Sequence, residues 1–408
     1  IGLTFLNLEI PTQDYILIAI DTEKAGLIAH SSNGLIEVKK LPEMKDEKLL
    51  IALRIYTNIV TSASLIGERP LRDYSIIKGC NLILASGISD LAAIHLTFYG
   101  MYLRQNWDLE LAFKQGAQAR TLTERYNPCR EIANCLNVLG SIIWYLKAPY
   151  KEAIELNRLS TSYGFENGEI ARAVISQCIA LTTESSMGEK LQNLLQQTDN
   201  AWEIVKKRAI FFPAIRALNL YVKALLSGTS QCKNILEENL FDAETQKKVN
   251  MSSHFFLITH YKSLLAFWYG DEKSALDYAL KAQTRSESMA PQSYSVDHLF
   301  FLGLLLLRHN STNNKEPLYE KTELQLKMLS DVCESNFSHK YLLILAEKSR
   351  NSGANTDDTS ALYQLAIKSA QEQGFIHFMA LGFELFAEFW VGKKNNFLAE
   401  PLLQKALV

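Results

Sequence analysis

Helical periodicity runs from one end of this 408-residue sequence to the other, and it limits the possible fold more than any other feature. We find no run of five or more strictly alternating residues that would indicate a strand. Apolar residues instead recur at the i, i+3, i+4 spacing of a helix that is buried on one face. One such stripe comprises Leu91, Ile94, Phe98, Met101 and Tyr102. The sequence therefore predicts an all-α protein of roughly seventeen helices, each of about 12–20 residues.

Prolines fall where these helices should begin or end. A proline restricts the residue before it to extended backbone and cannot donate a helical hydrogen bond. Pro213 suits the first turn of a helix. Pro401 lies inside an otherwise helical run, so we expect a helix start or a kink there. Six others separate periodic segments: Pro42, Pro70, Pro128, Pro149, Pro291 and Pro317.

Clusters of aromatic residues are followed, three times, by small or apolar residues spaced 4 and 3 apart. Small residues on the second helix of a hairpin let its partner pack close, and the large residues fill the remaining space. This alternation over about 30–40 residues is typical of tetratricopeptide repeats, although the full consensus is absent. We expect a right-handed α-solenoid of degenerate tetratricopeptide-like helix hairpins. The three pairs are Phe98, Tyr99, Tyr102 with Ala112, Gly116, Ala119; Phe267, Trp268, Tyr269 with Ala275, Ala279, Ala282; and Phe389, Trp390 with Ala399, Leu403, Ala406.

The length of the chain also favours a repeat array, because a single compact core stops growing at about 250–300 residues. No segment has the composition of a flexible linker between independent domains. We therefore interpret residues 1–408 as one continuous superhelix with an N-terminal half to about 227, a connector over 228–250 and a C-terminal half over 251–408. The connector contains Ile235, Leu236, Leu240 and Phe241, which predict a short helix. Because the first residue is Ile1 rather than Met, we expect a fragment of a longer protein.

Charge and composition disfavour nucleic-acid and membrane partners. The net charge is −2, and the most basic run, Lys206-Lys207-Arg208, ends a helical stretch, where cations suit the helix dipole. The most apolar run, Leu299 to Leu307, is far shorter than the ~20 residues of a membrane span. No secretion signal opens the sequence. Six scattered cysteines form no CxxC pair, and Cys129 and Cys135 would point about 240° apart on one helix. We expect a cytoplasmic protein without membrane insertion.

Known catalytic and cofactor motifs are absent from the sequence. It contains no GxGxxG, GxxxxGK[ST], GxSxG, HExxH or EF-hand loop. His254 and His260 are six residues apart and so face different sides of one helix. His298 and His309 are eleven apart, which separates them by about 16 Å. We therefore predict no catalytic residue, no cofactor and no metal site, and we expect that the chain is not an enzyme.

One polar stripe remains on the apolar segment 375–391. At 100° per residue, Glu384 lies about 20° from His377 and Glu388 about 40° from Glu384, so all three share one narrow face. One interpretation is a carboxylate-lined patch for a basic peptide or a metal. The other is the wet edge of a mostly buried helix, or a carboxylate that caps a neighbouring helix. If Glu384 were buried, it would need an arginine or backbone partner.

The C-terminal motifs also carry a family resemblance. The sequence AQEQGF at Ala370–Phe375 leads into ALGFELFAEF at Ala380–Phe389, and AEPLLQKA follows at Ala399–Ala406. Near the other end, Leu41-Pro42-Glu43-Met44 followed by Asp46 is similar to the family's approach to a helix. The chain resembles the helical region of large bacterial hybrid signalling proteins. Those carry a serine/threonine-kinase-like domain, a P-loop ATPase domain, this superhelix, and often a GAF domain and a histidine kinase.

The resemblance implies a function in signal transduction. It implies a non-catalytic scaffold or sensor-coupling module that binds a protein partner or ligand and relays to flanking kinase or ATPase domains. Any kinase or ATPase activity would reside in those domains. The helical arms of ATP-dependent transcriptional regulators are also similar, so the flanking domains stay open. The alternative is a free-standing tetratricopeptide-like adaptor that binds peptides, for which we expect a groove with clustered Arg, Lys or Asn on the inner helices.

Overall fold

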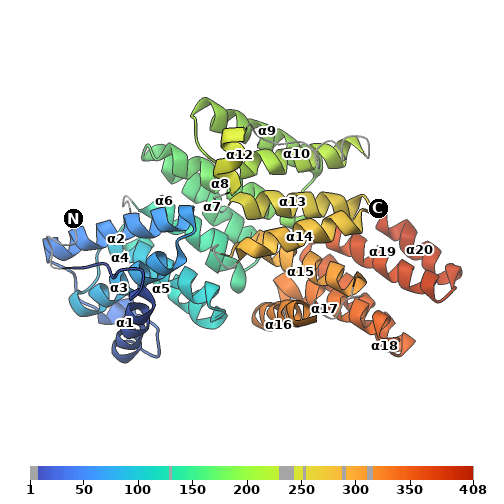
Figure 1. Cartoon of the computed structure of the whole chain (residues 1–408), viewed down its shortest axis with the longest axis horizontal. Coiled ribbons are helices and arrows are strands. Elements are labelled where there is room, and N and C mark those ends of the chain that lie inside the picture. The colour runs from blue at the N-terminus through green and yellow to red at the C-terminus, as the bar shows by residue number, and fades with distance from the viewer. Residues whose placement is uncertain are drawn as a thin grey trace.

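The computed structural model describes residues 8–127, 131–228, 243–250, 254–286, 291–309 and 316–407. The described residues form an all-α solenoid, and apart from two isolated bridges they contain no strand, as the sequence predicts (Figure 1). Most of the predicted connector lies outside the described residues, including the positions of its expected short helix. Only α12 (Ala243–Asn250) is described within it.

Most helices have 14–20 residues, in line with the periodicity, while α6, α12 and α20 are shorter. The first half contains α1 (Ile16–His30), η2 (Val38–Lys40), α2 (Glu47–Ile66), α3 (Arg69–Ser86), α4 (Asp90–Gln105), α5 (Leu109–Arg125), α6 (Ile132–Val138), η3 (Leu139–Ile143), η4 (Trp144–Leu146), α7 (Tyr150–Glu166), α8 (Ile170–Met187), α9 (Leu191–Lys207) and α10 (Ala214–Ser227). After α12 follow α13 (His254–Trp268), α14 (Glu272–Ser286), α15 (Ser293–Arg308), α16 (Glu316–Val332), α17 (Glu334–Asn351), α18 (Thr356–Gln373), α19 (Ile376–Gly392) and α20 (Asn396–Ala406).

The predicted hairpins α4/α5, α13/α14 and α19/α20 are present, and each packs its two helices together. In the first, a Cβ on Gly100 would lie 3.3 Å from the carbonyl oxygen of Ala112, so the two backbones approach closely. Ala275, Ala279 and Ala282 are all buried in the second. In the third, Ala399 is buried, but Leu403 is exposed on the outer side of α20. The large-then-small pattern thus marks the hairpin contacts.

Helix starts and ends follow local chemistry. Asp46 caps α2, because its carboxylate accepts hydrogen bonds from the backbone amides of Lys48 and Leu49. The basic run that begins at Lys206 ends α9, as predicted. Pro213 directly precedes α10. Pro401 lies inside α20, which begins at Asn396, so it does not start a helix.

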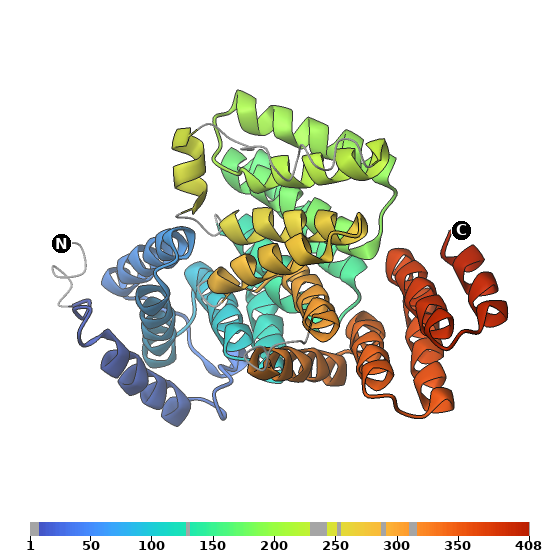
Figure 2. The same cartoon turned by 45° about the vertical axis from the view of Figure 1, so that its right-hand side comes forward.

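The solenoid returns on itself, so that helices distant in sequence meet. In Figure 2 the chain rises from α1 to α9 and α10 and comes back through α13–α15 to α16–α20. Asn336 of α17 donates hydrogen bonds to the backbone oxygens of Tyr145 and Ala148, at 2.7 and 2.8 Å. The hydroxyl oxygens of Thr183 and Ser293 lie 2.9 Å apart. These buried contacts tie the C-terminal half to the middle of the N-terminal half.

Helix α2 is the one described helix that is long and apolar enough to cross a membrane. One third of its apolar window (33%) is buried inside the protein, and Leu53, Tyr56 and Val60 are fully buried. Core helices of other proteins meet the same criterion, so the finding does not by itself indicate a membrane span.

Candidate functional site

The predicted stripe on α19 divides into two environments. Glu384 is exposed, Glu388 joins an ion-pair network, and His377 lies near the other end of the helix. His377 and Glu388 are eleven residues apart, which corresponds to about 16 Å along a helix. The three residues therefore share a face without forming one site.

His377 packs against the turn that ends helix α8. Its ring lies against Phe378, with centroids 4.4 Å apart, and a Cβ on Gly188 would come within 2.4 Å of its Nδ1. Gly188 ends α8 in a left-handed conformation, so this contact fixes the turn after α8. Burial, followed by the charge of Lys340, lowers the pKa of His377 to about 3. The histidine is therefore neutral at pH 7 and packs against Phe378 and the turn after α8.

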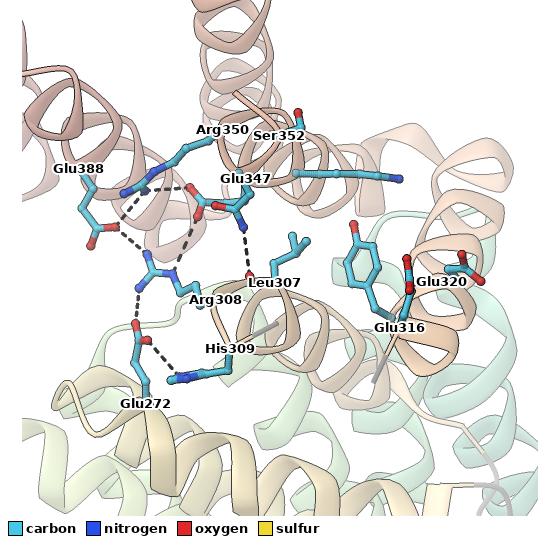
Figure 3. A pocket seen from close by; sticks show the side chains of 13 residues that line it. Glu272, Leu307, Arg308, His309, Glu316, Glu320, Glu347, Arg350, Ser352 and Glu388 are labelled. Atoms are coloured by element: carbon cyan, nitrogen blue, oxygen red, sulfur yellow. Dashed lines mark hydrogen bonds and ion pairs between the residues drawn. The ribbon is translucent and has the colours of Figure 1, made fainter. Parts of the chain in front are cut away.

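Glu388 lies in an open, acidic cup, which we define by its thirteen lining residues. They come from α14, α15, the turn after α15, α16, α17, the turn after α17, and α19, and they surround about 1020 Å³ (Figure 3). Five glutamates outnumber two arginines and one lysine. The lining residues are Glu272, Leu307, Arg308, His309, Glu316, Tyr319, Glu320, Glu347, Lys348, Arg350, Asn351, Ser352 and Glu388.

Two arginines connect the carboxylates on one side of the acidic cup. Arg308 donates to Glu272 and, at 2.7 Å, to Glu388, and its Nε lies 3.8 Å from Glu347 (Figure 3). Arg350 donates to Glu388 and Glu347, at 3.3 and 3.4 Å. The network therefore joins α14, α15, α17 and α19 through side chains alone.

The charges of this network are partly shielded from water. Burial raises the pKa of Glu347, while the Tyr363 hydroxyl and Arg350 oppose that shift. Burial alone would lower the pKa of Arg308, but the nearby carboxylates, Glu388 first, raise it overall. The pKa of Glu384 is raised by partial burial and then by the charge of Glu388. The arginines stay charged, and the ion pairs are stronger than fully exposed ones.

The opposite side of the acidic cup carries carboxylates that are not engaged. Glu316 and Glu320, one turn apart on α16, are exposed and form no ion pair with any residue that the structure describes. Two uncompensated carboxylates beside a compensated network leave the acidic cup with an excess of negative charge.

A second cavity, of about 210 Å³, lies between helices of the two halves. Asn134 and Asn137 from α6 and Arg172 from α8 line it together with aromatic residues that include Phe211 and Phe212. Within the described ranges, Arg172 forms no hydrogen bond or ion pair, and burial lowers its pKa. Clustered asparagine and arginine on inner helices are the feature that we expect of a peptide-binding adaptor.

The sequence did not reveal a buried ion pair between α15 and α17. Asp297 Oδ1 lies 3.4 Å from Lys340 Nζ, and neither residue is more than 5% exposed. The Lys340 ammonium also lies 4.1 Å from the ring centroid of Phe378. Burial raises the pKa of Asp297 and lowers that of Lys340, while their mutual attraction opposes both shifts. Periodicity could flag the charged residues on these helices but not their pairing.

The structure also pairs histidines that the sequence analysis considered separately. The rings of His260 and His298, on α13 and α15, have centroids 5.7 Å apart. Burial lowers the pKa of both, to about 3 for His298. Over the described residues, no group of three or more His, Cys, Asp or Glu side chains could hold a metal ion. The four cysteines that the structure describes are all buried: Cys80, Cys135, Cys178 and Cys333.

Comparisons with known proteins add little to this description. No family model matches the chain, and no curated protein matches it either. Among solved structures, the chain is similar to a Rap protein that was crystallised with competence and sporulation factor. The two are 14% identical, the match covers 97% of each chain, and the TM-score is 0.40. At these values the similarity concerns the helical fold and not what the Rap protein binds.

Proposed function

We propose that this chain is a non-catalytic scaffold and sensor-coupling module of a multidomain signalling protein, and that the acidic cup binds a basic segment of a protein partner or flanking domain. The observation that carries the proposal is the excess of carboxylates in an open cup built by several hairpins. An opening of about 1020 Å³ accommodates several side chains of a partner.

Lysine and arginine side chains of a partner fit this surface, because their positive charge complements its carboxylates. A partner's cation could pair with Glu316 and Glu320 without breaking any internal contact. A second cation could compete with Arg350 for Glu388, which is 39% exposed. Such rim charges contribute more to association rate and specificity than to affinity, so binding should weaken as salt is raised.

Binding at this place can be relayed because the acidic cup lies across successive hairpins. Repeats in a solenoid contact mainly their neighbours, so their relative orientation is the property that a ligand changes most readily. A segment held by α16 and α19 together would favour one spacing of these hairpins over others. Flanking kinase or ATPase domains would respond to that shift in population.

The test measures binding of a lysine-rich peptide to the chain, with a glutamate-rich peptide of equal length as the reference ligand. The Glu316→Gln/Glu320→Gln variant should weaken binding of the lysine-rich peptide about 5-fold or more, since each exposed pair contributes up to ~1 kcal/mol. The control variant, Glu166→Gln/Glu400→Gln, removes two exposed carboxylates elsewhere and leaves the same net charge. Equal affinity of both variants for the lysine-rich peptide would refute the role of the acidic cup.

The signalling context has its own test. We expect the reading frame on either side of residues 1–408 to encode kinase-like or ATPase domains. Deletion of this region from that longer protein should alter kinase regulation. Unchanged regulation would contradict the coupling role even if the acidic cup binds a basic peptide.

The second candidate is a free-standing peptide-binding adaptor, which the 210 Å³ cavity favours. Asparagine amides can bond the backbone of an extended peptide, and Arg172, which forms no hydrogen bond or ion pair with the described residues, can pair with a carboxylate of that peptide. This alternative predicts that the glutamate-rich peptide binds and that Arg172→Gln abolishes its binding. A reading frame that ends near Val408 would support the same alternative.

A further inference from the structure

A third cavity, of about 360 Å³, lies where the start of the solenoid meets its second half. The ends of α3 and α4 form one wall, and α13–α16 form the other. Its fourteen lining residues include three cations and no carboxylate: Arg69, Arg104, Gln105, Asn106, Trp107, Phe256, Gln283, Ser286, Pro291, Ser295, His298, Leu299, Lys321 and Gln325. This composition is the reverse of that of the acidic cup.

Arg104 is the residue that makes this cavity unusual. It is 1% exposed, yet its Nε and Nη1 have no hydrogen-bond partner among the residues that the structure describes. No carboxylate of the described residues forms an ion pair with it. Its guanidinium carbon lies 4.7 Å from the ring centroid of Trp107, a contact that orients the group without neutralising it. A buried cation without a counter-charge is strongly disfavoured, because it has lost its hydration without gaining a partner.

Arg72, on the neighbouring helix α3, is a second buried arginine and can be compared with Arg104. It is also 1% exposed, but its Nη2 donates to Asp73 at 3.0 Å and also to Gln105. Among the residues that the structure describes, a carboxylate thus pairs with one buried arginine and none with the other. The unpaired donors of Arg104 are available to an anionic ligand.

We propose that this cavity binds a small organic anion, with a phosphate or carboxylate group held by Arg104. Arginine is suited to this task because its planar fork donates two hydrogen bonds to an oxyanion. Arg69 and Lys321 add positive charge, although Arg69 is already paired with Asp73. No carboxylate among the lining residues repels the anion.

The rest of the cavity recognises the body of the ligand. Gln283 accepts a hydrogen bond from His298 at 3.0 Å, which leaves its amide nitrogen to donate to a ligand. Gln325 of α16 adds a second side-chain amide on the same wall, and Phe256 and Leu299 supply apolar surface. A cavity of about 360 Å³ admits a metabolite-sized anion but not a folded domain.

Binding here would join the two halves of the solenoid, because residues 69–107 and 256–325 form opposite walls. A ligand that binds only when both walls are in place stabilises that arrangement of the two halves by mass action. The inference concerns a cavity separate from the acidic cup and does not rest on the function proposed for it.

The test uses sodium pyrophosphate and sodium citrate as probes, each against sodium chloride at equal ionic strength. For the whole chain we expect a saturable rise in melting temperature with at least one probe, together with a change in tryptophan fluorescence. Response to pyrophosphate alone assigns a phosphate ligand, and response to citrate alone assigns a carboxylate ligand. No saturable response to either probe would overturn the proposal.

Variants then locate the binding. Arg104→Gln should weaken binding of the active probe at least tenfold, and Lys321→Ala, on the exposed side of α16, about 3-fold or more. Arg120→Gln is the matched control for the first, because Arg120 also lies over a tryptophan, at 4.6 Å from the ring centroid of Trp144. Lys327→Ala, on the same helix as Lys321, is the control for the second. Undiminished binding in Arg104→Gln would refute the site. If that variant proved hard to fold, undiminished binding in Lys321→Ala would refute it.

Discussion

Replacement of Lys340 by methionine should cost about 4 kcal/mol of folding free energy at pH 7. Methionine has a similar length but lacks the ammonium, which compensates Asp297, lies 4.1 Å from the ring centroid of Phe378 and lies 3.0 Å from His339 Nε2. The largest of these losses is the charge that compensates Asp297. Asp297 is 5% exposed and cannot keep its charge without a partner. It must therefore take up a proton on folding.

The magnitude follows from that proton. The carboxyl has a pKa of 3.8 in the unfolded chain, so its protonation at pH 7 spans 3.2 pKa units. At 1.36 kcal/mol per unit this amounts to about 4 kcal/mol. At pH 5 the same step spans only 1.2 units and costs about 2 kcal/mol. The penalty should shrink as the pH falls, because the folded variant binds a proton that the unfolded chain lacks.

The assay is urea unfolding of both proteins at pH 7 and pH 5. The double variant Lys340→Met/Asp297→Asn should recover most of the loss, since a buried ion pair can be replaced by neutral groups at little cost. Lys327→Met is the control, because its exposed pair with Asp331 contributes ~1 kcal/mol or less. A penalty that is the same at both pH values would refute the argument, as would a double variant less stable than Lys340→Met.

Three further predictions concern single contacts. Asn336→Leu removes two buried hydrogen bonds between the halves and should cost about 2–4 kcal/mol in denaturant unfolding; a loss below 1 kcal/mol would contradict their role. Gly87→Ala places a Cβ 2.3 Å from a backbone oxygen and should cost more than 3 kcal/mol, whereas Gly168→Ala, with open space around it, should cost only about 1–2 kcal/mol for its positive φ. Burial lowers the pKa of His298 to about 3, so the stability that its neutral form contributes is present above pH 6.5 and is lost as the pH falls. His298→Gln should therefore reduce the loss of folding free energy between pH 6.5 and 4 by up to about 3 kcal/mol. A variant whose stability falls with pH as steeply as that of the original protein would contradict this.

The sequence predicts the local features of this fold well, because they depend on neighbours along the chain. The helical period and the aromatic-then-small hairpins both follow from contacts within one or two helices. The binding features do not. Periodicity places His377 and Glu388 on one face of α19, but it cannot show that one end of that face packs on α8 and the other on α15 and α17. The pairs Asp297–Lys340 and His260–His298 likewise depend on how successive hairpins stack, since each joins a helix to the next but one along the chain.

The acidic cup and the cavity at Arg104 are built on the same helices, and this leads to a last prediction. Near its start α14 contributes Glu272 to the acidic cup, and near its end it contributes Gln283 to the cavity. Helix α15 does the same in the opposite order, with His298 in the cavity and Arg308 in the acidic cup. A rigid helix cannot move at one end alone. A ligand that shifts α14 or α15 at one site therefore also shifts the residues that these helices contribute to the other site.

Linkage then requires that the two effects be equal. If the active anion changes the affinity for the lysine-rich peptide by some factor, the peptide must change the affinity for the anion by the same factor, typically about 5–150-fold in coupled proteins. Calorimetric titration of each ligand in the absence and presence of saturating partner measures both factors. Two factors of 1 would show that α14 and α15 do not couple the sites. Competition that excess of either ligand overcomes completely would show instead that both ligands bind at one place. We do not expect this result, because the linings of the two sites have opposite charges.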